Sequence, residues 1–178
     1  MIGSFRQFDL AHNPEYRTDH GKELEETRSV MANGAIHSNL AHPFEMKFDH
    51  AGISVPDLES SIAWYGTMLG FEVEGRATLP PVQAKIAFLR RGNLRVELFE
   101  VPGAAALPDD RRVPDEDLRT HGNKHVCYAV KDVRALTDEL KSRGADIVFI
   151  KEMEQVTVAY IRDNAGNLIE LVQRPDLW

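Results

Sequence analysis

The feature of this 178-residue sequence that most constrains its fold is an internal repeat. The segment FDHAGISVPDLESSIAWYGTMLGFEV is matched further along the chain by NKHVCYAVKDVRALTDELKSRGADIV. His50 aligns with His125 at an offset of 75 residues, and Glu97 aligns with Glu170 at an offset of 73. Self-similarity of this kind predicts that one supersecondary unit is used twice.

Each copy predicts a strand, a helix and three further strands, a βαβββ unit. Asp57 and Asp132 stand where a helix N-cap accepts hydrogen bonds from free backbone amides. Gly70 and Gly144 stand where each helix ends, because a left-handed residue there favours glycine. The predicted strands cover about 47–55, 71–78, 83–90 and 94–101 in the first copy, and about 123–130, 146–151, 155–162 and 167–173 in the second.

The repeat divides the chain into four parts. Residues 1–46 form an N-terminal extension with one predicted helix near 21–32, and residues 47–101 form the first module. Residues 102–121 form a connecting arm, in which three prolines prevent a continuous helix or a central strand. Residues 122–174 form the second module.

Composition excludes several classes of protein. The formal net charge of −7 lacks the cationic excess that binds a phosphate backbone, so we expect no nucleic-acid partner. The single cysteine, Cys127, excludes an intrachain disulfide framework. Without a secretory signal or a run of 18 apolar residues, the expectation is a cytoplasmic protein with no membrane partner.

Side chains alternate between the two faces of a strand, and this places the histidines and glutamates on the faces turned away from the helices. His50 and His125 alternate with the apolar residues that suit packing against a helix, and so do Glu97 and Glu170. Taken singly, such a histidine is more often structural, and such a glutamate can protect a sheet edge. Because the pairing occurs twice, we expect all four to converge if the sheets curl toward each other.

Convergence of these four side chains favours a bound cation. Unpartnered carboxylates are costly to bury, and two carboxylates neutralise one divalent ion. Imidazole nitrogen and carboxylate oxygen suit Zn, Ni, Co, Mn or Fe, so the sequence predicts one divalent metal ion held by His50, Glu97, His125 and Glu170.

Other residues are weaker candidates. Arg95 and Phe99 share the face of Glu97, where Arg95 can bind an anion or simply be a solvated rim residue, and Phe99 can stack on a substrate. His121 lies four residues before His125 and reaches the same pocket if that strand extends far enough. Cys127 is interpreted as a small pocket-wall residue rather than a nucleophile.

The motifs DHAGISVPDLESSIAWYGTMLGFEV, VELFE, KHVCYAV and RDNAGNLIELV resemble those of the vicinal-oxygen-chelate superfamily, which contains glyoxalase I, methylmalonyl-CoA epimerase, extradiol dioxygenases and bleomycin-resistance proteins. The resemblance covers residues 47–174. It implies an α+β fold in which two βαβββ modules form an incomplete eight-stranded barrel around a metal site. By position it implies the same four ligands, and it places Tyr160 where the dioxygenases have a tyrosine near the metal.

Departures from individual families narrow the function. Ser54 and Val101 replace the Arg and Asn that glyoxalase I uses to hold glutathione. The stretch 79–84, LPPVQA, lacks the carboxylate that the epimerases place before their third strand. The dioxygenases bind iron with two His and one Glu, whereas Glu97 would be a fourth ligand here.

These observations predict a metal-dependent, glyoxalase-like lyase or isomerase that acts on a small molecule. A proton next to a carbonyl would move through a metal-bound enediolate, with Glu170 or Glu97 as the general base. The alternatives are an iron-dependent extradiol-type dioxygenase and a resistance-type protein that binds a small molecule without turnover. A homodimer is compatible with the repeat, since such modules pair within one chain or between two.

Overall fold

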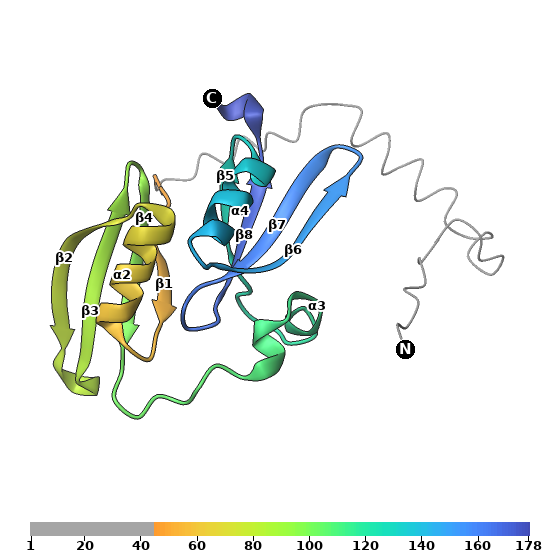
Figure 1. Cartoon of the computed structure of the whole chain (residues 1–178). Coiled ribbons are helices and arrows are strands. Elements are labelled where there is room, and N and C mark those ends of the chain that lie inside the picture. The colour runs from red at the N-terminus through yellow and green to blue at the C-terminus, as the bar shows by residue number, and fades with distance from the viewer. Residues whose placement is uncertain (1–44) are drawn as a thin grey trace. The chain divides into compact units, whose positions relative to one another are not determined.

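Two copies of one unit make up most of the computed structural model, which describes residues 45–178 (Figure 1). The first contains β1 (Ala51–Ser54), α2 (Leu58–Leu69), β2 (Glu72–Leu79), β3 (Ala84–Arg91) and β4 (Leu94–Glu100). The second contains β5 (Val126–Val130), α4 (Val133–Ser142), β6 (Asp146–Met153), β7 (Val156–Arg162) and β8 (Leu168–Gln173). The βαβββ prediction is therefore confirmed twice. The helix predicted near 21–32 lies outside the described residues.

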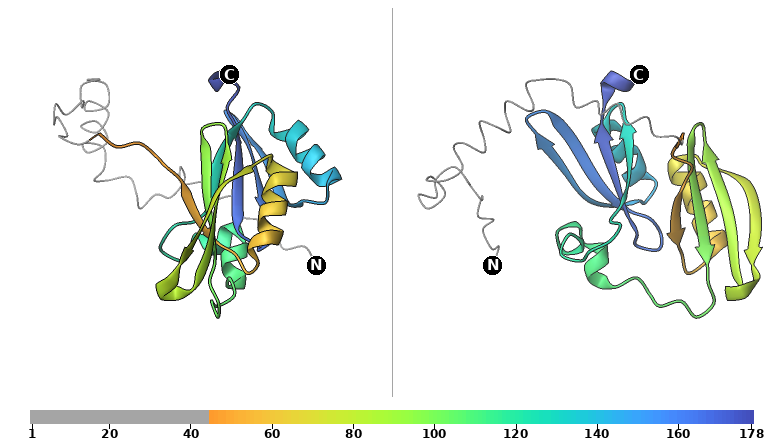
Figure 2. Two further views of the ribbon diagram at one scale, coloured as in Figure 1. Left: turned by 90° about the vertical axis from the view of Figure 1, so that its left-hand side faces the viewer. Right: turned by 180° about the vertical axis from the view of Figure 1, so that it is seen from behind.

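Each module forms its own four-stranded sheet. The strand orders are β1-β4-β3-β2 and β5-β8-β7-β6, so the opening strand lies parallel to the closing strand in both. Figures 1 and 2 show α2 against one face of the first sheet and α4 against one face of the second. The α+β class is confirmed, and no strand pairing within residues 45–178 closes the sheets into a barrel. The expected incomplete barrel is thus a pair of open sheets.

The opening strands are shorter than the alternation predicts. They begin at Ala51 and Val126, so His50 and His125 each lie one residue before a strand. The alternation extends to both histidines in the sequence, but ladder hydrogen bonds to the closing strand start one residue later. The two histidines therefore occupy equivalent positions at the entrance of their strands.

Both helices are held at their N-termini in the same way. The Asp57 carboxylate accepts from the Ser60 amide at 2.6 Å, and the Asp132 carboxylate accepts from the Ala135 amide at 3.0 Å. These bonds confirm the predicted N-caps. At the end of α2, Gly70 has φ +67°, the left-handed conformation expected of it.

The end of each closing strand also caps its own helix. The Glu100 carboxylate accepts from the Leu58 amide at 2.8 Å, and the Gln173 side-chain oxygen accepts from the Val133 amide at 3.1 Å. The two acceptors are 73 residues apart, the same offset that relates Glu97 to Glu170. This second cap fixes each helix to the strand that carries the candidate ligand.

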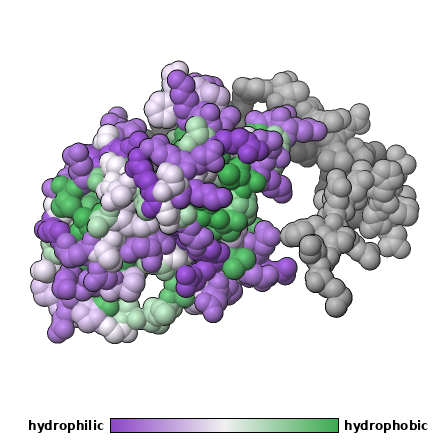
Figure 3. All heavy atoms as spheres, viewed as in Figure 1, coloured by the Kyte–Doolittle hydropathy of each residue, from purple (hydrophilic) through white to green (hydrophobic). Residues whose placement is uncertain are grey.

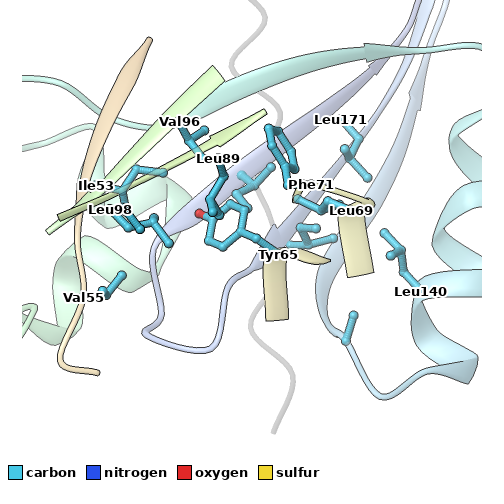
Figure 4. Packing of buried hydrophobic residues seen from close by; sticks show 14 of the residues in the cluster. Ile53, Val55, Tyr65, Leu69, Phe71, Leu89, Val96, Leu98, Leu140 and Leu171 are labelled. Atoms are coloured by element: carbon cyan, nitrogen blue, oxygen red, sulfur yellow. The ribbon is translucent and has the colours of Figure 1, made fainter. Parts of the chain in front are cut away.

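One hydrophobic core joins the modules (Figure 4). Leu89, Val96 and Leu98 from the first sheet and Leu171 from the second belong to the same buried cluster. Tyr65 of α2 lies within it, and its hydroxyl donates to the Asp163 carboxylate of the β7–β8 turn at 3.2 Å. The Tyr65 side chain is fully buried.

A β-bulge interrupts the second strand of each module at the same place. The register of β2 against β3 shifts between Val73 and Gly75, and that of β6 against β7 shifts between Ile147 and Phe149. Bulges turn the local strand and redirect a side chain. The residue at the bulge is Glu74 in the first module, and in the second it is a valine.

The connecting arm contains only short helical segments, as its prolines predict. They are one 3₁₀ turn at Asp109–Arg112 and a four-residue helix, α3, at Pro114–Asp117. Outside the arm, two further 3₁₀ turns lie at Pro80–Val82 and Pro175–Leu177. The surface seen in Figure 3 is mostly hydrophilic with smaller apolar patches, in keeping with the acidic composition. Among the described residues, none of the helices has the length and apolar character needed to cross a membrane.

Candidate functional site

Each module brings its histidine to its own glutamate. The Nε2 atom of His50 lies 2.9 Å from Oε2 of Glu97, and the Nε2 atom of His125 lies 2.8 Å from Oε2 of Glu170. These are hydrogen-bond distances between one nitrogen and one oxygen ligand atom. The pairing predicted from the repeat is therefore present inside both modules.

The sheets put these side chains on matching positions. Val96 and Leu98, on either side of Glu97, are fully buried, whereas the Glu97 side chain is 14% exposed. In the second module, Ile169 and Leu171 are buried, and the Glu170 side chain is 19% exposed. Strand alternation thus turns both carboxylates away from the helix-covered core, at the edge of solvent.

The two pairs do not form one cluster in this structure. Within residues 45–178, no group of three or more His, Cys, Asp or Glu side chains is close enough to hold a metal together. Each pair supplies one nitrogen and one oxygen donor, a set that suits the borderline divalent ions. The sharing of one ion by both pairs stays a prediction.

The ring of His50 has a carboxylate on each side. Its Nδ1 lies 2.6 Å from Oδ2 of Asp49, and its Nε2 faces Glu97. A neutral imidazole carries one hydrogen and can donate to only one of two acceptors. A cation bound jointly by Nε2 and Glu97 would remove this conflict, so the residues present fit a metal ion.

The ring of His125 has a different neighbour. The Tyr160 hydroxyl lies 3.3 Å from Nδ1 and 3.4 Å from Nε2, and Tyr160 is also the cross-strand partner of Glu170. Desolvation and the negative charge of Glu170 raise the pKa of Tyr160 to about 12, so the hydroxyl remains a donor at neutral pH. Tyr160 therefore lies against the second histidine, and its role near a metal or substrate stays a prediction.

Cys127 lies opposite Glu170 in the register of β5 against β8. Desolvation, the charge of Glu170 and a hydrogen bond to it raise the pKa of the Cys127 thiol to about 12. A thiol of this kind is not a nucleophile at neutral pH, because the thiolate is the reactive form. This agrees with the interpretation of Cys127 as a wall residue.

The structure gives Arg95 partners within its own module. Its guanidinium donates to Asp49 at 2.6 Å and to Glu74 at 2.5 Å, and it lies 4.5 Å from the centre of the Phe88 ring. The two carboxylates raise the pKa of Arg95 above its usual value, so it stays cationic. Its expected contact with a substrate stays a prediction, and its observed contacts are internal.

Phe99 and His121 are the two remaining candidate residues for contact with a substrate. Phe99 lies opposite Ser54 in the register of β1 against β4, and a Cβ added at Gly52 would come within 3.1 Å of its ring. Gly52 therefore leaves space that Phe99 occupies. His121 is exposed in the segment between α3 and β5. For both residues, a role toward substrate stays a prediction.

Sequence reasoning missed the carboxylates behind the first histidine. Asp49 precedes β1, and Glu74 is placed by a bulge, so neither follows from strand alternation. It also missed the buried Asp117, which pairs with Arg111 and lies 3.7 Å from the Lys124 ammonium. An acidic residue directly before the ligand was the only available signal for Asp49.

Comparison with known proteins identifies the family. Residues 47–171 match the Glyoxalase/Bleomycin resistance protein/Dioxygenase superfamily, and the chain belongs to it. The chain is 31% identical over 133 residues to the ethylmalonyl-CoA/methylmalonyl-CoA epimerase of Cereibacter sphaeroides, covering 71% of this chain and 97% of that protein. It is 26% identical over 134 residues to the mitochondrial methylmalonyl-CoA epimerase of Homo sapiens, covering 71% and 73%.

A solved structure supports the same fold. A glyoxalase family protein from Enterococcus faecalis superposes with a TM-score of 0.61 at 20% sequence identity, covering 71% of this chain and 96% of its own. The family match and the two epimerase relatives together support an enzyme of the isomerase or lyase kind.

Proposed function

We propose that this protein is a metal-dependent isomerase that moves a proton on the carbon next to a carbonyl group of a small molecule. The observation that carries the proposal is the repeated His–Glu pair, at 2.9 Å in one module and 2.8 Å in the other. His50, Glu97, His125 and Glu170 would hold one divalent ion. When bound, such an ion stabilises negative charge that develops on a substrate oxygen.

The two glutamates are the groups that transfer the proton. A carboxylate at the edge of solvent can take a proton from carbon and return it, which is general acid–base chemistry. Glu100 lies on the same strand as Glu97, but the Leu58 amide and the Lys85 ammonium already engage its carboxylate at 2.8 and 2.6 Å. Glu97 and Glu170 are the carboxylates paired with the candidate histidines, one from each module.

The similarity to two acyl-CoA epimerases suggests the first substrate class to test, a thioester with a branched acyl group. Inverting such a carbon requires removal of a proton from one side and delivery from the other. The stretch 79–84 provides no carboxylate for the second step, so the proposal assigns the two steps to the two modules.

Deuterium exchange tests the proposal directly. The protein, loaded with Zn, Ni, Co, Mn or Fe in turn, is incubated with methylmalonyl-CoA in D₂O, and uptake of deuterium at the acyl carbon is measured by mass spectrometry. The hemithioacetal of methylglyoxal serves as a second substrate. We expect exchange with one of the two substrates, loss of exchange after chelation, and its return when the ion is added back.

Two results would contradict this function. Substrate-dependent oxygen uptake by the iron form would indicate a dioxygenase. Tight ligand binding that survives both chelation and Glu170→Gln, without exchange, would indicate a binding protein.

A further inference from the structure

We propose that Asp49 is a positioning residue that sets the orientation of the His50 ring, and that the first module therefore presents its ligand nitrogen in a fixed direction while the second does not. The proposal deepens the function proposed above and rests on it where it concerns the metal ion.

The contact with Asp49 engages one of the two ring nitrogens of His50. Nδ1 of His50 lies 2.6 Å from Oδ2 of Asp49. Carboxylates only accept and lie beside both ring nitrogens, and the shorter contact, 2.6 Å to Asp49 against 2.9 Å to Glu97, favours the ring hydrogen on Nδ1. Nε2 then remains for Glu97, 2.9 Å away, and for an ion held beside it. A carboxylate behind a ligating histidine fixes the ring and raises its basicity.

Asp49 is itself held in place. Its side chain is 68% exposed and precedes the strand, so packing alone would not fix it. The Arg95 guanidinium donates to the same Oδ2 atom at 2.6 Å. Arg95 is in turn held by Glu74 at 2.5 Å and lies over the Phe88 ring. His50 meets the same ring edge-on, with 5.8 Å between centroids.

These residues lie on three separate elements. Asp49 lies two residues before β1, Glu74 stands at the bulge of β2, and Arg95 is near the start of β4. The contacts from His50 and Arg95 both end on Oδ2 of Asp49. Glu74, Arg95, Asp49 and His50 form what we term the orienting chain.

The second module has no counterpart to this chain. The residue before His125 is Lys124, whose ammonium donates to the Asp117 carbonyl oxygen of the arm at 2.6 Å. Val148 stands at the bulge that corresponds to Glu74, and Leu168 lies at the offset of 73 from Arg95. In the second module, a lysine that contacts the arm thus replaces Asp49, and apolar residues replace Glu74 and Arg95.

Substitution of Asp49 tests the proposal with two separate measurements. The variants are Asp49→Ala, which removes the acceptor, and Asp49→Asn, which keeps one oxygen without the charge. Glu59→Ala is the matched control, because it removes a carboxylate of the same module whose ion-pair partner among residues 45–178 is Arg76. Circular dichroism establishes that all variants are folded.

The first measurement needs no metal. In metal-free protein labelled with ¹⁵N-histidine, we expect an exchange-protected Nδ1–H signal from His50 that is present in the wild type and in Glu59→Ala. It should be lost in Asp49→Ala and weakened in Asp49→Asn, while the signals of His125 stay unchanged. A His50 signal that survives Asp49→Ala, or that is missing from the wild type, would overturn the proposal.

The second measurement is the dissociation constant for Zn²⁺, from competition with a chromophoric chelator. We expect Asp49→Ala to weaken zinc binding about 10- to 100-fold, the usual effect of losing such a carboxylate, with Asp49→Asn in between. Equal zinc affinity in wild type and Asp49→Ala would overturn the role of Asp49 toward the ion. A wild type that shows the NMR result but binds none of the five metals would instead reject the proposed function and leave the orientation of His50 by Asp49 supported.

Discussion

The two modules place the same His–Glu pair in the same register and surround it with different side chains. Glu97 lies opposite Gly52 and Phe88, and Glu170 lies opposite Cys127 and Tyr160. Behind the first histidine lies a chain of charged groups that ends in a carboxylate, whereas a phenol hydroxyl lies against the second. The two copies thus share the candidate ligands but differ in the residues that contact them.

In the proposed shared site, this difference would combine a firm half with an adaptable half. A ring fixed by a carboxylate loses little freedom when it binds an ion, which favours affinity. A ring beside a weakly aligned hydroxyl at 3.3–3.4 Å can adjust when a substrate enters. We expect the first module to dominate ion binding and the second to respond more strongly to substrate.

The largest expected effect tests whether the glutamates of both modules take part in the reaction. Glu97→Gln and Glu170→Gln each remove a carboxylate while keeping its size, so each should lower the deuterium-exchange rate about 10²- to 10⁴-fold. Glu59→Ala should leave the rate unchanged. A wild-type rate in either glutamine variant would show that its module contributes no group to proton transfer.

A smaller effect is expected from making the second module resemble the first. Tyr160→Phe places there the residue type that stands opposite Glu97, Phe88. It removes a donor beside His125 and Glu170, which we expect to lower the exchange rate about tenfold, with a smaller change in zinc affinity because Tyr160 is not a ligand. Steady-state kinetics and zinc titration measure the two effects. A larger change in zinc affinity than in rate would contradict the division between the two halves.

The smallest effect concerns the contact that joins the modules. Tyr65→Phe removes the hydroxyl that donates to Asp163, and we expect a loss of about 1 kcal/mol, because Asp163 keeps its bonds from the Ala165 and Asn167 amides. Urea unfolding measures the free energy, and an unchanged value would show that this bond contributes nothing to stability.

Because the Tyr65 side chain and the Tyr128 hydroxyl are buried, we expect the protein to lose stability at alkaline pH. Burial first, and then the charge of Asp163, raise the pKa of Tyr65 well above 10 in the folded protein, and burial raises that of Tyr128 to about 12. The folded state therefore holds these protons more tightly than the unfolded state. Their stabilisation is complete below pH 10 and is lost as the pH rises above it. Tyr65→Phe should show a shallower decline between pH 10 and 12 than the wild type.

How far the sequence predicts this molecule depends on whether a feature recurs along the chain. The repeat predicts both βαβββ units, the caps at Asp57 and Asp132 and the two His–Glu pairs, because each rests on local spacing that occurs twice. Strand starts are set too early at both histidines, since side-chain alternation continues past the last ladder hydrogen bond.

What occurs only once could not be predicted in the same way. Arg95 has the spacing of a rim residue, and only the structure shows that its guanidinium donates to Glu74 and Asp49 of its own module. Tyr65 and Asp163 are 98 residues apart, and their contact depends on how the modules pack. Tertiary contacts of this kind leave no periodic signal in the sequence.

The number of metal ions bound per chain tests the shared site most directly. Elemental analysis of the purified protein, loaded with zinc and then dialysed, should give one ion per chain for the wild type. His50→Ala and His125→Ala should each abolish that stoichiometric binding, because both modules supply ligands to the same ion. Two ions per chain in the wild type, with one remaining in each variant, would show that the two pairs act as separate sites and would contradict the account.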